Sequence, residues 1–130
     1  MIKALRVVMI VFGAIGIIVG LSDIFIPDQF AKMYGFSAVA DWVRWSSALG
    51  GASFIAAGVW VIVAARDPIK HILWVKFVIT KSLLFAVVTA YSLIQGYVKF
   101  SQVGGMFILF VIFAVLFFVF YPWRAKASSA

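Results

Sequence analysis

Four long apolar runs dominate this 130-residue sequence and constrain its fold more than any other feature. A helix needs roughly 20 predominantly apolar residues to cross a bilayer. The helices of a soluble bundle also carry a polar outer face, which these runs lack. The sequence therefore predicts an all-α fold, an integral membrane four-helix bundle, in which residues 1–130 form a single membrane domain. We expect spans over residues 4–26, 41–65, 69–95 and 103–121.

Composition supports a membrane protein and excludes several chemistries. Hydrophobic residues make up 66% of the chain, whereas a soluble domain is closer to half apolar. The formal net charge is +7, but the basic residues lie mostly at the ends of the predicted helices, where they meet anionic headgroups. We therefore expect lipid and no nucleic acid as a partner. The absence of cysteine excludes disulfides, thiolate chemistry and cysteine-ligated clusters.

The basic residues of the short loops predict the orientation. One side of the membrane would hold Lys3, Arg6, Arg66, Lys70, Arg124 and Lys126, and the other Lys32, Arg44 and Lys99. Loops rich in Lys and Arg stay on the cytoplasmic side. We therefore predict an inner or plasma membrane protein with both termini in the cytoplasm.

Small residues recur at helical spacing in the first two predicted spans. Small side chains let the backbones of membrane helices approach closely, so we predict that these faces pack against other helices. It stays open whether the serines also donate to a polar group or a ligand. The first span carries Gly13, Gly16 and Gly20, and the second carries Ser46, Gly50, Ser53 and Ala57, widened by Ser47, Gly51 and Gly58.

A short segment between these two spans has its own helix signals. Pro27 suits the first turn of a helix, and Gly35 suits the position just after its end. Phe30, Met33 and Tyr34 would share one face, which indicates a short helix lying on the headgroups. The alternative is an irregular loop with aromatic anchors.

The third span carries a lysine near its middle, Lys81. A charge at bilayer depth costs roughly 2.5–3.5 kcal/mol on insertion scales, so it faces a bundle interior or a polar partner. The residues at a comparable depth predict one polar site with surplus positive charge, for an anion, a quinone carbonyl or a lipid headgroup. The alternative is one ion pair and a lysine that reaches toward the interface, binding nothing. The candidate site residues are Lys81, Asp23, Arg44, Ser47 and Ser53.

No set of catalytic residues is recognisable in the sequence. His71 is the single histidine, so the chain cannot build a multi-histidine metal site by itself. The four aspartates form no pair with acid–base spacing, and no phosphate-binding or nucleophile motif is present. We expect no enzymatic activity, no metal and no resident cofactor, with a quinone or a bound lipid as the alternative.

Turn and packing residues follow one another in a recognisable order along the chain: Pro27, Phe30, Tyr34-Gly35-Phe36, Arg44, Ala48-Leu49-Gly50-Gly51, Ala57-Gly58 and Ala65-Arg66-Asp67-Pro68. This order resembles the DoxX-like family of small four-helix membrane proteins. The resemblance implies an integral four-helix bundle, and some relatives are linked to quinone-coupled oxidation beside other subunits. We therefore expect an accessory subunit of a larger membrane complex or a self-associating bundle. The alternative is a binder or carrier of a quinone, lipid or anion that uses the site around Lys81.

Overall fold

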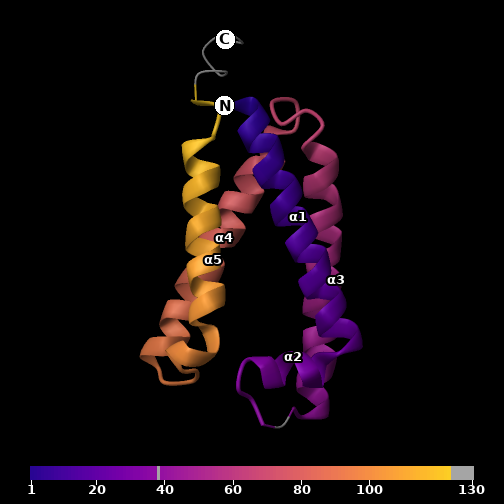
Figure 1. Cartoon of the computed structure of the whole chain (residues 1–130), viewed down its shortest axis with the longest axis vertical. Coiled ribbons are helices and arrows are strands. Elements are labelled where there is room, and N and C mark those ends of the chain that lie inside the picture. Colours follow the sequence, from indigo (N-terminus) through magenta and orange to yellow (C-terminus); the bar gives the residue numbers. More distant parts are fainter. Residues whose placement is uncertain (38, 124–130) are drawn as a thin grey trace.

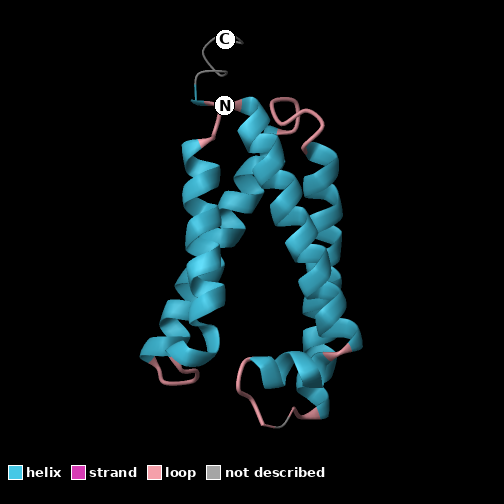
Figure 2. Ribbon diagram, viewed as in Figure 1, coloured by secondary structure: helices cyan, strands magenta, loops and turns pink. Residues whose placement is uncertain are grey.

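The computed structural model describes residues 1–37 and 39–123, so the predicted placement of Arg124 and Lys126 lies outside it. Figure 2 shows that the described chain consists of helices joined by loops and contains no strand. Four of the helices are long and apolar enough to cross a membrane, which confirms the predicted fold class. The elements are α1 (Ile2–Phe25), α2 (Pro27–Met33), α3 (Asp41–Ala64), α4 (Ile72–Ile94) and α5 (Phe100–Val119).

The helix boundaries agree with the predicted spans to within three residues. The short helix α2 lies between the first two spans, as predicted, and begins with Pro27. Gly35 follows it with a φ of 77°, a backbone conformation that glycine adopts without strain. The last helix begins at Phe100 rather than at residue 103, because the side chain of Gln102 accepts a hydrogen bond from the backbone N–H of Lys99 (2.9 Å).

The four spanning helices form two pairs, α1 with α3 and α4 with α5 (Figure 1). The pairs meet at the end that carries the N-terminus and separate toward the end that carries α2 (Figure 1). All four helices contribute to one apolar cluster at the N-terminal end, which holds the pairs together there. The buried residues of this cluster include Leu5, Met9, Val61, Ala64, Val75, Val78, Phe117 and Tyr121.

Glycines bring α1 and α3 into backbone contact. A Cβ atom built on Gly13 would lie 2.7 Å from the carbonyl oxygen of Gly58, and one on Gly58 would lie 2.6 Å from that of Gly13. Gly20 and Gly51 repeat this arrangement two turns away. No side chain fits at these distances, so each position requires glycine. Gly16 lies between the two crossings and is less crowded, with its nearest atom 3.5 Å from a built Cβ.

The predicted packing stripe on α3 is wrong for most of its members, but two of the residues predicted to widen it, Gly51 and Gly58, do face α1. A Cβ atom on Gly50 would meet no atom within 4 Å, and Ser46 and Ser53 are exposed. Of the predicted row only Ala57 is buried. The contact is made by the neighbouring row, because Gly51 and Gly58 have the same two-turn spacing as Gly20 and Gly13 on the antiparallel α1.

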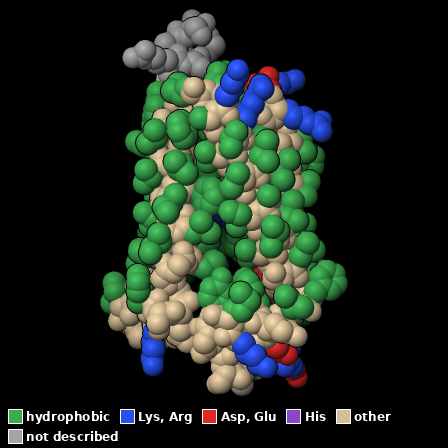
Figure 3. All heavy atoms as spheres, in the orientation of Figure 1, with side chains coloured by type: hydrophobic (Ala, Val, Ile, Leu, Met, Phe, Trp, Pro, Cys, Tyr) green, Lys and Arg blue, Asp and Glu red, His purple; other side chains and the backbone are tan. Residues whose placement is uncertain are grey.

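The surface matches the predicted membrane setting. Figure 3 shows hydrophobic side chains covering the middle of the visible face, while lysine, arginine and acidic side chains gather at its two ends. Many large apolar residues of the spans are exposed, as expected where the surrounding medium is hydrocarbon.

Candidate functional site

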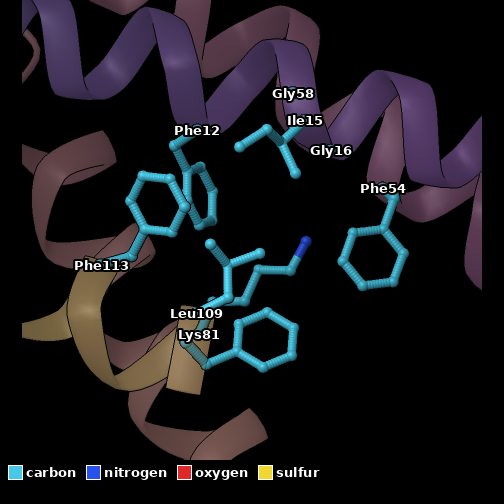
Figure 4. Close-up of a pocket in the computed structure, with 9 residues that line it drawn as sticks. Phe12, Ile15, Gly16, Phe54, Gly58, Lys81, Leu109 and Phe113 are labelled. Carbon is cyan, nitrogen blue, oxygen red and sulfur yellow. The ribbon is translucent and has the colours of Figure 1, made fainter. Parts of the chain in front are cut away.

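Lys81 projects into the interior between the two helix pairs. Figure 4 shows its side chain crossing a small pocket from α4 toward α1 and α3, with the nitrogen between Ile15 and Phe54. The side chain is half-buried in the middle of α4. By contrast Lys76, on the same helix, is exposed. The ammonium group of Lys81 therefore faces the interior of the bundle, as predicted.

The pocket around Lys81 encloses about 30 Å³, which is room for about one water molecule. It lies next to the apolar cluster, with which it shares Phe12 and Phe113. Every spanning helix contributes to its wall, and Lys81 is the one charged residue in it. The lining residues are Phe12, Ile15, Gly16, Phe54, Gly58, Lys81, Leu109, Phe110 and Phe113.

Aromatic faces surround the ammonium group. The Lys81 nitrogen lies 4.2 Å from the centre of the Phe54 ring and 5.8 Å from that of Phe85. Both distances are within the range in which a cation is attracted to the face of a ring. Over residues 1–37 and 39–123, neither the hydrogen bonds nor the ion pairs give this ammonium an oxygen partner. The positive charge is therefore oriented by π faces and lacks a counterion in the chain described.

The structure does not bring together the polar cluster predicted from the sequence. Arg44 was expected beside Asp23, but its guanidinium donates to both carboxylate oxygens of Asp28, at 3.0 and 3.1 Å. It also donates to Asp41, one turn earlier in α3, at 2.6 Å. The helix α2 follows α1 directly and contacts α3, so the Asp28 carboxylate reaches Arg44 first.

Asp23 and Lys81 also lie apart. Asp23 accepts a hydrogen bond from the hydroxyl of Ser47 at 3.3 Å, and Ser53 donates to the carbonyl of Leu49 within its own helix at 3.1 Å. The predicted contact of Lys81 with any of the three is therefore wrong. The physical reason is the separation of the helix pairs toward α2, which carries Asp23 and Ser47 away from α4.

Asp23 and Lys81 line separate pockets, which lie on the same side of α1, toward the cleft between the helix pairs. On α1, Asp23 follows Gly16 by two turns, and on α3, Ser47 precedes Phe54 by two turns. Residues two turns apart lie on the same helix face, about 10 Å apart along the axis. Figure 3 shows the visible face hollowed between the two helix pairs over this stretch. A negative and a positive group thus lie at two depths of one cleft.

Sequence reasoning missed the aromatic partners of Lys81. Phe85 follows Lys81 by four residues, so the two side chains share a helix face, and this spacing is a readable signal. Phe54 is the large aromatic residue on an otherwise small-residue face of α3, but its approach to Lys81 depends on how the two pairs dock.

No family model, curated protein or solved structure matches the chain. The resemblance to the DoxX-like proteins therefore stays a prediction, and the arguments for function rest on the geometry of the site.

Proposed function

We propose that this integral membrane protein binds or carries a small amphipathic anion, whose charged end is held by Lys81. The observation that supports this is the inward-facing ammonium group, which has aromatic faces around it and no carboxylate. Cation–π contacts contribute about 0.5–2 kcal/mol, while a lysine at the bilayer centre costs roughly 2.5–3.5 kcal/mol. The aromatic faces thus offset part of the cost, and an anionic ligand would offset the rest.

The position of Lys81 within the cleft favours an amphipathic ligand. A pocket of about 30 Å³ has room beside the ammonium group for one oxygen atom of a ligand headgroup and for no larger body. The remainder of the ligand would lie in the cleft between the helix pairs, against apolar side chains. A quinone carbonyl is the weaker candidate, because it can accept a hydrogen bond from the ammonium group but brings no negative charge to balance the positive one.

Native mass spectrometry of the protein extracted in mild detergent tests this proposal. We expect a retained acidic amphiphile on the wild type and on Lys76→Met, and its loss from Lys81→Met. Lys76→Met is the matched control, since it removes an exposed lysine from the same helix. An adduct that survives in Lys81→Met would overturn the proposal.

A second candidate function is the accessory or self-associating role that the sequence suggested. It is supported by the outward-facing stripe of Ser46, Gly50 and Ser53, which is left open on α3 and would let a helix of another chain approach closely. Size-exclusion chromatography with mass determination tests it. Gly50→Leu should then release a partner or a second copy without unfolding the chain, and an unchanged mass would count against this role.

A further inference from the structure

A larger pocket lies at the α2 end of the cleft, and we call it the α2 pocket. It encloses about 630 Å³. Four aromatic residues line it, three from α2 and the chain after it and one from the loop between α4 and α5. Its polar side-chain groups are one carboxylate and one serine hydroxyl from the facing helices α1 and α3, together with the hydroxyls of two tyrosines. The residues that matter here are Asp23, Phe30, Tyr34, Phe36, Ser47 and Tyr97.

The carboxylate of Asp23 has few hydrogen-bond or ion-pair partners in the described residues. Its neighbour is the hydroxyl of Ser47, at 3.3 Å, and within the described residues no ion pair includes Asp23. Arg44 is held by Asp28 and Asp41 instead. The charge is half-buried, so water screens it less than a surface charge.

The aromatic residues of the pocket lie beside this carboxylate and carry no charge themselves. The Phe30 and Tyr34 rings pack edge to face with their centres 5.1 Å apart, so their faces point in different directions. Burial, and secondarily the charge of Asp23, raises the pKa of the Tyr34 hydroxyl above its ordinary value. At neutral pH this hydroxyl therefore stays protonated, and the ring keeps its electron-rich face.

We propose that the α2 pocket binds a small organic ammonium ion, of the quaternary type found in choline. Several aromatic faces beside one carboxylate match the chemistry that recognises such ions, because the rings attract the diffuse charge and need no directed hydrogen bonds. A hard divalent cation is a poor fit, since it demands six or more oxygen ligands, and one carboxylate with the hydroxyls of one serine and two tyrosines supplies too few.

The proposal does not depend on the Lys81 function. The two pockets have no lining residue in common, and the charged groups in them have opposite sign. Lys81→Met should therefore leave the lining of the α2 pocket unchanged and, because it removes a positive charge, should not weaken choline binding there.

Equilibrium dialysis of radiolabelled choline against the protein in phosphatidylglycerol nanodiscs tests the site, with empty nanodiscs as the blank. We expect saturable binding to the wild type and to Lys81→Met. Asp23→Asn, checked by circular dichroism for folding, should bind at least tenfold more weakly. The neutral isostere 3,3-dimethyl-1-butanol should fail to compete, because it has the shape of choline without the charge.

A second pair of variants keeps the test informative if Asp23→Asn does not fold. Tyr34→Leu should weaken choline binding about three- to tenfold, while Tyr34→Phe keeps the ring and should bind like the wild type. Repeating the dialysis in phosphatidylcholine nanodiscs identifies the source of the ion: weaker choline binding there means that the lipid headgroup occupies the pocket, and equal binding means that a soluble ion does. Wild-type affinity in both Asp23→Asn and Tyr34→Leu, or equal competition by the neutral alcohol, would overturn the proposal.

Discussion

The ammonium nitrogen of Lys81 lies 4.2 Å from the centre of the Phe54 ring, between the two helix pairs. Through this contact the Lys81 side chain points into the bundle, although α4 is surrounded by apolar groups on every side. The ring offsets only part of the free-energy cost of this charge. The protein without a bound ligand should therefore become more stable when the charge is removed.

Lys81→Met should raise the free energy of unfolding in detergent by about 1 kcal/mol, as measured by thermal melting. Phe54→Leu should lower it, because the ammonium loses its nearest ring face. Lys76→Met is the control and should change little, since that exposed lysine can reach the headgroups. A Lys81→Met protein that melts below the wild type would show that Lys81 is a structural requirement.

The glycine crossing of α1 and α3 predicts a sharp contrast between two glycines of one helix. Gly58→Leu should destabilise the bundle by about 2–4 kcal/mol or prevent its assembly, because a Cβ there would lie 2.6 Å from the backbone of Gly13. Gly50→Leu should leave the melting temperature of the isolated chain unchanged, since its Cβ would meet no atom within 4 Å. Equal melting of the two variants would contradict the observed face of α3.

Ser82 offers a test of a buried polar group. Its side chain is fully buried in α4, and its hydroxyl has no hydrogen-bond partner in the part of the chain that the structure describes. Ser82→Ala should therefore keep the stability or raise it by about 1 kcal/mol. Ser47→Ala is the comparison and should lose about 1 kcal/mol, because the Asp23 carboxylate loses its donor. A marked loss in Ser82→Ala would mean that the hydroxyl has a partner, such as bound water.

The predicted orientation can be tested with reporter fusions. A reporter at the C-terminus should be active only on the cytoplasmic side, and one inserted in residues 95–99 should be active only on the outer side. These two positions belong to opposite ends of the last span. A C-terminal fusion that reports from the outer side would reverse the predicted orientation and place the α2 pocket on the cytoplasmic side of the membrane.

The sequence predicts much of this fold because the dominant physical signal is local. The length and apolar character of each run define the spans, and Pro27 with Gly35 defines α2. The glycine face of α1 could be read as well, since only small residues permit such a close crossing. The sequence could not predict which of the two adjacent rows of small residues on α3 would contact this glycine face. Both rows have suitable spacing, and the choice depends on how α3 is aligned with α1.

The polar site was harder to predict because it depends on tertiary arrangement. Depth along each helix suggested that Asp23, Arg44 and Lys81 could meet. Depth does not reveal that α2 brings Asp28 to Arg44, or that the two helix pairs separate and leave Asp23 far from Lys81. The inward direction of Lys81 was predictable from the cost of its charge, whereas its Phe54 partner comes from the other helix pair.

The most direct test of the Lys81 site compares dodecanoate with dodecanol in binding to the purified protein in nanodiscs. The two ligands share one chain length and differ in the charge of the headgroup. The wild type and Lys76→Met should prefer dodecanoate at least tenfold, and Lys81→Met should show no preference, because the preference comes from one ammonium group. Equal affinity of the wild type for both ligands, or a preference that persists in Lys81→Met, would contradict an anion site at Lys81.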